Sequence, residues 1–416
     1  MDPIKIIFIL PNIYESINGV STKYTTFINY LTNLSINYNI VVITTFKDKD
    51  IFTNLSKKNN LTIIKTKGIV VPFYKDIKIP IIDESLLKNE IKNGNEIIVF
   101  NGEFIWLYDI LNKIKNKNKS IKIYPTMHTD YIFYSENIYK NYKFGLPASL
   151  NHLNHYLDKK IFNGIIVTGQ LLTTKYLEVT ENVFNANEVN LNIFNNIKKD
   201  NYDIDYYNII YCGRVSKEKN IDEIFTCCSE LNNYNYKIHI IGDGPYLSNL
   251  KDIIDLEYPK IKSNIIFHGS KSPEEINNLY QTLDNRIFLF TSISETFGKT
   301  PMEACSTGIP IFIKKSDTTD LLYINKRNAF IFNDSKDFLL LFEYFIKLDI
   351  LEKQIFITDS INNIKQYDQQ IIFHDWIDFL INGRITKAKV KLNLFDIFTF
   401  QGISKFITCT GSIMSD

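Results

Sequence analysis

Two series of short apolar, β-branched runs, each alternating with helix-like stretches, constrain the fold of this 416-residue chain more than any other feature. In the first half, such runs lie at residues 4–10, 39–44, 96–100, 121–125 and 164–168. In the second half, they lie at 208–212, 237–241, 264–268, 286–290, 309–313 and 328–332, with helices expected at 219–233, 245–255, 273–283 and 301–307. Continuous apolar strands separated by helices are typical of parallel sheets covered on both faces. We therefore predict an α/β protein with two Rossmann-like, doubly wound domains and a ligand between them.

The boundary between these domains is expected where the alternation stops. From about residue 170 to residue 206 the sequence becomes rich in Asn and Asp. We predict an N-terminal domain over 1–172, an interdomain linker over 173–206 and a C-terminal domain over 207–362. After about residue 335 the chain becomes helical.

Composition excludes several classes of function. The formal net charge of +1 predicts no bulk attraction to nucleic acid or to an anionic membrane. Five cysteines without C-x-x-C spacing favour a reducing compartment. The first residues lack a secretion signal, and no apolar run approaches the ~20 residues needed to span a bilayer. We expect a cytoplasmic protein without a nucleic-acid partner, and peripheral attachment to a membrane stays open.

The stretch ISETFGKTPMEACSTGIP, residues 293–310, is the most informative candidate site. It follows an expected strand, and ligands bind at the carboxyl ends of strands in open α/β sheets. Thr300 and Pro301 are expected as N-cap and first residue of a helix, which would place Glu303 in its first turn beside backbone N–H groups suited to phosphate. Taken alone, Thr300 and Glu303 could equally form a capping box. Glu295 supplies a second carboxylate in the same stretch.

Two further loops of the second series favour an anionic ligand. In GRVSKEKN, residues 213–220, Gly213 ends a strand, and Arg214 and Lys219 follow at the mouth of the next helix. Such cations would suit a diphosphate, although each alone could be a solvated surface charge. The turn formed by Gly242 and Gly244 permits close approach of the backbone to a nucleotide, but a bare turn of this kind could also be structural.

Together these motifs resemble the family 4 retaining glycosyltransferases of group 1, over most of residues 1–382. The resemblance implies the GT-B fold, in which two Rossmann-like domains face a cleft. It implies that Glu303 binds the ribose hydroxyls of the donor and that Glu295 contacts the donor sugar. Arg214 and Lys219 would then hold the diphosphate, and the turn at Gly242 and Gly244 would lie near the base. The loop between the two carboxylates would also contact the donor, through Phe297, Gly298, Lys299 and Thr300.

The resemblance extends to the N-terminal half. Gly19, in the Asn18-Gly19-Val20 loop, matches the loop after the first strand, whose amides approach the phosphate and the acceptor. His128 matches an active-site histidine that contacts the donor sugar, although a lone histidine is more often a core or capping residue. Asp130 and Tyr134 are weaker candidates for contact with the acceptor. The aromatic stretch 131–146 could cover an acyl chain or simply pack in the core.

Other parts of the chain match the family less closely. In NANEVNLNIF, residues 185–194, Glu188 stands in place of a family Gly and Asn190 in place of an Asp, which bears on the backbone geometry of this loop. Residues 363–384 resemble the helices that cross back to the first domain, and an ordinary packing helix is the alternative. Both interpretations predict that Trp376 is buried. Residues 385–416 form a tail whose segment 389–398 could be an edge strand or a membrane-surface segment.

The resemblance implies front-face, retaining transfer of a hexosyl group from a nucleotide-diphosphate sugar, with UDP favoured over GDP and a glycolipid acceptor favoured. Protein, polysaccharide and small-molecule acceptors stay open. No metal ion and no cofactor are expected, because the nucleotide-sugar is a substrate. Asp48 with Asp50, and Asp203 with Asp205, have D-x-D spacing but are interpreted as solvated charge. The alternatives are a non-catalytic nucleotide-sugar sensor or scaffold, an epimerase and, less favoured, a phosphorylase on the same fold.

Overall fold

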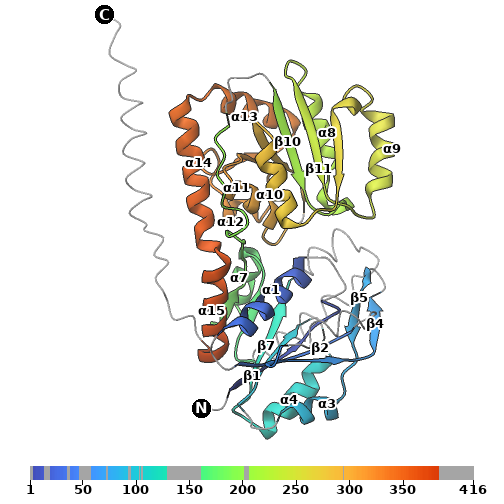
Figure 1. Cartoon of the computed structure of the whole chain (residues 1–416), viewed down its shortest axis with the longest axis vertical. Coiled ribbons are helices and arrows are strands. Elements are labelled where there is room, and N and C mark those ends of the chain that lie inside the picture. The colour runs from blue at the N-terminus through green and yellow to red at the C-terminus, as the bar shows by residue number, and fades with distance from the viewer. Residues whose placement is uncertain are drawn as a thin grey trace, which may run out of the picture.

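The two halves of the chain form two α/β units stacked end to end, and two consecutive helices run along one side of both (Figure 1). The structure, a computed structural model, describes residues 3–13, 19–34, 38–45, 58–71, 74–91, 95–102, 104, 106–128, 161–200, 206–293 and 295–383. Asp130, Tyr134, the stretch 131–146, both D-x-D pairs and the tail 385–416 lie outside these residues.

The first half is built on a seven-stranded parallel sheet in the order β3-β2-β1-β6-β7-β8-β9. Helices α1 and α15 pack on one face of this sheet, and α3, α4 and α7 on the other. The strands span Ile4–Ile9 (β1), Tyr38–Thr44 (β2), Leu61–Lys65 (β3), Ile97–Asn101 (β6), Lys122–Met127 (β7), Ile165–Val167 (β8) and Val183–Asn185 (β9). The helices span Gly19–Asn33 (α1), Glu84–Glu90 (α3), Leu107–Lys117 (α4) and Gln170–Leu177 (α7).

The second half holds a six-stranded parallel sheet in the order β12-β11-β10-β13-β14-β15. Counted within this half, the order is 3-2-1-4-5-6, which is the Rossmann arrangement. The strands span Tyr207–Cys212 (β10), Tyr236–Ile241 (β11), Ile265–Gly269 (β12), Arg286–Phe290 (β13), Ile311–Lys314 (β14) and Phe330–Phe332 (β15). The helices span Asp222–Ser229 (α8), Leu247–Glu257 (α9), Pro273–Thr282 (α10), Lys299–Ser306 (α11), Thr319–Leu322 (α12), Ser335–Lys347 (α13) and Ile350–Ile364 (α14), with 3₁₀ turns at Lys217–Lys219, Lys262–Asn264 and Lys365–Tyr367. The predicted α/β fold with two Rossmann-like units is confirmed.

Three features of the secondary structure differ from the sequence prediction. The alternation does not stop at residue 170, because α7 and β9 follow and β9 forms the edge of the first sheet. The helix expected over 219–233 begins only at Asp222, after a 3₁₀ turn. The antiparallel hairpin of β4 (Gly68–Val71) and β5 (Tyr74–Pro80) was not predicted, nor was β3.

The last described helix, α15 (Gln369–Asn382), packs in the core of the first half, although in the sequence it follows the elements of the second half. Trp376 is fully buried and stacks on Phe27 of α1, with ring centroids 3.9 Å apart and an angle of 2° between the planes. The predicted burial of Trp376 is therefore confirmed. In Figure 1, α14 lies on the second unit and α15 continues along the first.

The segment that precedes β10 packs on the second sheet. Phe194 joins the core of that half, and the buried carboxylate of Asp200 pairs with the buried guanidinium of Arg286 at 2.8 Å. The same guanidinium donates to the carbonyl of Lys198 at 2.8 Å. These contacts fix residues 194–200 to the second half. Among the described residues, no helix combines the length and the apolar character needed to cross a bilayer.

Candidate functional site

Three loops meet at the carboxyl edge of the second sheet. They are the β10 loop (213–216), the β11 loop (242–246) and the β13 loop (291–298). The β10 and β11 loops pack with almost no space between their backbones, since a Cβ on Gly242 would lie 1.9 Å from the carbonyl oxygen of Gly213. Gly242 also has φ of 134°, a conformation that favours glycine. Gly244 likewise lies against Val215, whose N–H donates to the carbonyl of Asp243 at 2.9 Å.

The β13 loop is tied to the turn that follows the β10 loop. The hydroxyl of Thr291 donates to the carbonyl of Lys219 at 3.2 Å, and the N–H of Ile293 donates to the carbonyl of Glu218 at 3.3 Å. The ammonium of Lys219 pairs with the carboxylate of Glu295, and both side chains are 20% exposed. Two predicted site residues from different loops are thus in direct contact. Arg214 lies exposed on the β10 loop, whose carbonyl at that residue accepts a bond from the hydroxyl of Tyr211 at 2.9 Å.

The start of α11 differs from the prediction, which made Thr300 the N-cap and Pro301 the first helical residue. The N-cap is Gly298, with φ of 71°, and no side chain caps the helix. Because glycine permits this left-handed turn, the helix begins at Lys299 and Thr300 becomes its second residue. Glu303 lies in the second turn and not in the first. Phe297 is buried against the core of the second half, so its side chain anchors the loop.

Glu303 is 8% exposed, and the pKa of its carboxyl is raised. Burial raises the pKa of this carboxyl to about 7, the nearby ammonium of Lys299 opposes the rise, and the carboxylate of Glu188 adds to it. A buried carboxyl with a pKa near neutrality is common at functional sites. We therefore keep Glu303 as a central residue of the candidate site.

Glu188 was identified in the sequence only as a departure from the family pattern. Its side chain is 1% exposed, and its two carboxylate oxygens lie 2.9 and 3.1 Å from the Nζ atom of Lys299. The side-chain amide of Gln369, at the start of α15, donates to the same carboxylate at 3.0 Å. Lys299 was expected in the site, whereas Glu188 and Gln369 were not. The sequence did contain a signal for this ion pair, because Glu188 is acidic and Lys299, in the β13 stretch, carries the opposite charge.

The N-terminal contribution is a buried hydrogen-bonded group around His128. Its Nδ1 atom lies 2.8 Å from the hydroxyl of Thr168, and its Nε2 atom lies 3.0 Å from the hydroxyl of Tyr24. Burial, together with the charge of Lys23, lowers the pKa of His128 to about 3, so the imidazole is neutral at physiological pH. Gly19 begins α1, and a Cβ added there would meet no atom of the described residues within 4 Å.

Lys23 was not predicted as a site residue. It is 6% exposed, and its ammonium donates to the hydroxyl of Thr168 at 3.1 Å. Burial lowers the pKa of Lys23 to about 8, and the charges of Glu188 and Lys299 also act on it. Lys23 therefore couples the group around His128 to the charges beside the β13 stretch.

The two halves touch at Gly169 and Thr296. Gly169 follows β8 and has φ of 108°, and a Cβ on it would lie 2.1 Å from the carbonyl oxygen of Thr296 in the β13 loop. A second connection joins residues 186–190, here called the interdomain loop, to α15. The N–H of Val189 donates to the carbonyl of Tyr367 at 2.8 Å, and the N–H of Gln369 donates to the carbonyl of Val189 at 2.9 Å. The β13 loop is thus held against the first half.

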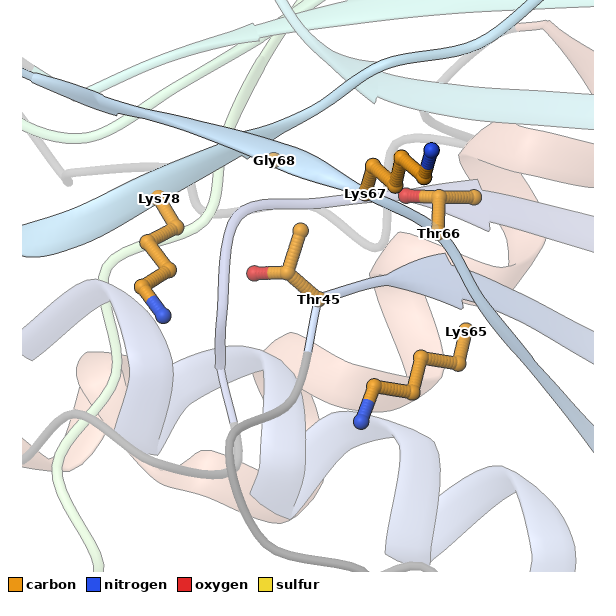
Figure 2. A pocket seen from close by; sticks show the side chains of 6 residues that line it. All are labelled: Thr45, Lys65, Thr66, Lys67, Gly68 and Lys78. Carbon is orange, nitrogen blue, oxygen red and sulfur yellow. The ribbon is translucent and has the colours of Figure 1, made fainter.

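A hollow lies away from this edge, on the first half. A cavity of about 390 Å³ is lined by Thr45, Lys65, Thr66, Lys67, Gly68 and Lys78, which Figure 2 shows. In that view, Lys65 and Lys78 lie on either side of Thr45 and extend toward the same side, whereas Lys67 points away. A second cavity, of about 10 Å³, lies beside the β13 loop. In the described ranges, no group of three or more His, Cys, Asp or Glu side chains could hold a metal ion.

Comparison with known proteins agrees with the resemblance found in the sequence. Residues 192–356 match the family model of glycosyl transferases group 1. The alpha-monoglucosyldiacylglycerol synthase of Streptococcus pneumoniae is 31% identical over 105 residues, which are 25% of this chain and 23% of that protein. The enzyme of the same name from Acholeplasma laidlawii is 31% identical over 135 residues, 32% of this chain and 33% of that protein. The matched segments therefore span about a quarter to a third of these relatives.

Solved structures resemble the whole fold. A glycosyltransferase from Rickettsia africae has a TM-score of 0.69 and 16% identity, covering 93% of this chain and 100% of that one. The Anabaena protein HepE in complex with UDP has a TM-score of 0.67 and 14% identity, covering 91% of this chain and 100% of that one. The predicted GT-B fold is confirmed, and so is the resemblance to the group 1 family.

Proposed function

We propose, from the premise that residues 192–356 form a group 1 glycosyltransferase domain, that this protein is a retaining hexosyltransferase using a nucleotide-diphosphate sugar. One observation carries the proposal. The residues that the resemblance assigns to the donor, Lys219, Glu295 and Glu303, lie at the carboxyl edge of the sheet within the matched segment. Ligands of open α/β sheets bind at this edge.

In the proposed reaction, the donor diphosphate lies beside Arg214 and Lys219, and the ribose hydroxyls donate to Glu303. The bond between the anomeric carbon and the diphosphate oxygen breaks, and the acceptor hydroxyl forms its new bond on the same face. The hydroxyl proton passes to the departing phosphate oxygen. Fixed cations aimed at a developing charge stabilise such a transition state without reorganisation.

His128 is proposed to contact the donor sugar as a neutral imidazole. Its two ring nitrogens already have hydroxyl partners, so its orientation is fixed before the donor binds. Gly19 is proposed to bring the first backbone amides of α1 toward the phosphate, which its open surroundings permit. The proposed mechanism needs neither a metal ion nor a cofactor, because the lysine and arginine cations carry the charge of the diphosphate.

For the donor, we favour UDP-sugars over GDP-sugars, since HepE of similar fold was solved with UDP and with UDP-glucose. For the acceptor, we favour a glycolipid, because the two similar synthases described above are named for diacylglycerol glycolipids. Such an acceptor implies a cytoplasmic enzyme that works at a membrane surface as a peripheral protein.

The experiment is an assay of nucleotide release and glycosyl transfer. The full chain is incubated with UDP- and GDP-hexoses and with diacylglycerol, glycolipid and free-sugar acceptors, beside Glu303→Ala and Lys219→Ala. We expect release and transfer by the wild type with a UDP-sugar, and loss in both variants. The glutamine variant of an exposed carboxylate, Glu181→Gln, serves as the control and should behave as wild type.

The outcomes separate the alternatives. Tight binding of a nucleotide-sugar without release under any acceptor would favour a non-catalytic sensor. Conversion of the donor to an isomeric nucleotide-sugar would indicate an epimerase. Absence of nucleotide binding would remove the assignment of the donor site.

A further inference from the structure

The first inference concerns Glu188, which no assignment of the donor site includes. The family resemblance places a glycine at this position, yet the backbone here accepts a side chain, because Glu188 is absent from the described non-glycine residues with positive φ. The carboxylate is 1% exposed. Burying a charge in this way is costly unless partners compensate it.

The partners come from three different elements. Glu188 lies in the interdomain loop, Lys299 is the first residue of α11, and Gln369 is the first residue of α15. The ammonium and the amide bind the same carboxylate at distances of 2.9 to 3.1 Å. The carboxylate therefore joins the donor-side helix to the helix that packs on the first half.

These charges also surround Glu303. Lys299 faces it from its own helix, and Glu188 faces it from the interdomain loop. Two further described groups coupled to Glu303 are the neutral thiol of Cys212 at the end of β10 and the neutral phenol of Tyr280 on α10. Lys23 of α1 acts in turn on Glu188 and Lys299. Lys299 is thus the cation between two buried carboxylates.

We propose that Glu188 is a positioning residue of the donor site, which holds Lys299 beside Glu303 and connects donor binding to the contact between the two halves. The inference rests on the proposed function, since it takes Glu303 as the group that accepts hydrogen bonds from the nucleotide ribose. The ionised carboxylate offers both of its oxygens as acceptors, whereas the protonated carboxyl has a donor O–H on one of them. Nucleotide affinity should therefore rise with pH through the titration of Glu303, near pH 7 in the wild type.

The test is the pH profile of UDP affinity, measured by calorimetry on the full chain. Glu188→Gln removes the negative charge that raises the pKa of Glu303 and leaves the ammonium of Lys299 beside Glu303. The midpoint of the affinity profile should therefore move to lower pH. Lys299→Met removes the opposite charge, so the midpoint should move to higher pH. A role limited to folding would lower affinity or stability but would not move the two midpoints in opposite directions.

Glu181→Gln, which removes an exposed carboxylate close by in the sequence, should leave the midpoint unchanged. Thermal unfolding of each variant shows whether it is folded. If the wild type binds UDP and both variants keep its midpoint, the inference about Glu188 is wrong and the donor site stands. If the wild type binds no nucleotide at any pH, the donor-site assignment itself is wrong, and the inference falls with it.

A second inference, independent of the donor site, concerns the cavity in Figure 2. Thr45 directly follows β2, Lys65 ends β3 and Lys78 lies on β5, so the cavity is at the carboxyl edge of the first sheet. The main chain of Lys78 exchanges two hydrogen bonds with Asn12 in the loop after β1, at 2.7 and 3.2 Å. The hairpin that carries Lys78 is therefore fixed to the loop expected to approach the acceptor.

The described lining of this cavity is cationic. Within the described part of the chain, no carboxylate forms an ion pair with Lys65, Lys67 or Lys78. The side chain of Thr45 is 2% exposed, and its hydroxyl has no hydrogen-bond partner among the described residues. An unpartnered buried hydroxyl costs free energy, which a ligand with acceptor oxygens would recover. Gly68 lets the hairpin lie on Thr45, because a Cβ there would meet the Thr45 methyl group at 2.5 Å.

The geometry points to a binding site for a phosphate group between Lys65 and Lys78, with Thr45 at its base. Lysine ammonium groups bind phosphate as point charges, and a hydroxyl adds a directed hydrogen bond. The phosphate can belong to a soluble ester or to the headgroup of an anionic lipid. Two probes distinguish these sources. They are glycerol 3-phosphate and vesicles of phosphatidylcholine with or without phosphatidylglycerol.

We expect binding of at least one probe, weakened by salt and reduced roughly tenfold or more in the Lys65→Ala/Lys78→Ala variant. The control Lys113→Ala/Lys117→Ala removes two charges from α4 of the same half and should bind as wild type. Thr45→Val should lower affinity without lowering the unfolding temperature, since it removes a buried hydroxyl that lacks a partner among the described residues. Loss with glycerol 3-phosphate assigns a soluble ester, and loss with vesicles alone assigns a headgroup. Binding of neither probe, or equal binding by both double variants, would overturn the inference.

Discussion

The ammonium of Lys219 pairs with the carboxylate of Glu295 and so joins the turn after the β10 loop to the β13 loop. Lys219→Ala removes the cation proposed for the diphosphate and leaves Glu295 unpaired. We expect UDP affinity to fall roughly ten- to hundredfold, the range of a hydrogen bond to a charged group. Calorimetric titration of UDP measures this change.

The neighbouring Lys217 provides the matched control. It is exposed in the same 3₁₀ turn, so Lys217→Ala removes an equal charge without touching Glu295. An equal loss of affinity in both variants would show that only the general positive potential of the turn matters.

A second prediction concerns His128 and the dependence of stability on pH. Its pKa is about 3 in the folded protein, against about 6.5 for an ordinary histidine. Below pH 6.5 the unfolded chain binds a proton at this residue that the folded protein does not bind. The contribution of His128 to the free energy of unfolding is therefore complete above that pH. It is lost as pH falls toward 3, by up to about 1.4 kcal/mol per pH unit.

Urea unfolding of the wild type and of His128→Gln between pH 4.5 and 7 tests this expectation. The difference in unfolding free energy between the two proteins should shrink as pH falls, because glutamine does not titrate. Burial also lowers the pKa of His239, to about 4. The difference in unfolding free energy between the wild type and His239→Gln should therefore also shrink as pH falls. Parallel curves for His128→Gln and the wild type would contradict the prediction.

The sequence was sufficient for most strands of the two parallel sheets and for the site loops at their ends. Continuous runs such as those of β1 and β10 are unambiguous, because a buried parallel strand needs apolar side chains on both faces. The hairpin of β4 and β5 was missed, since its lysines and exposed apolar residues give no such run. The short strand β9 was missed because three residues carry too little pattern to separate them from a linker.

The sequence predicted which single residues of each loop belong to the candidate site, but not the contacts between segments that lie far apart in the sequence. Lys219 and Glu295 lie 76 positions apart, and their contact follows once both are placed at the same sheet edge. The contact of Glu188 with Gln369 spans 181 positions and depends on how α15 returns to the first half. No local pattern specifies that return. The prediction of Thr300 as the N-cap was wrong because the left-handed turn of Gly298 starts the helix earlier.

A third prediction uses the contact between Gly169 and Thr296. Gly169→Ala places a methyl group 2.1 Å from the Thr296 carbonyl oxygen and also strains a backbone with φ of 108°. We expect the β13 loop and the first half to separate locally, with lower kcat/KM for transfer and a lower unfolding temperature. Small-angle scattering should show a larger radius of gyration. Thr174→Ala, at an exposed position on α7, the helix that Gly169 precedes, is the control and should leave all three unchanged.

The last prediction separates packing from polarity in the helix that returns to the first half. Trp376 stacks on Phe27, yet its buried indole N–H has no hydrogen-bond partner in the described part of the chain. Trp376→Phe keeps an aromatic ring and removes the unsatisfied donor, so we expect a loss of less than about 1.5 kcal/mol in unfolding free energy. Trp376→Ala empties the same space and should cost about 3–5 kcal/mol. Trp106→Phe, at a residue 44% exposed, serves as the reference for fluorescence and should cost little. Equal losses for Trp376→Phe and Trp376→Ala would mean that the indole N–H has a partner in solution, and that α15 is held by polarity as much as by packing.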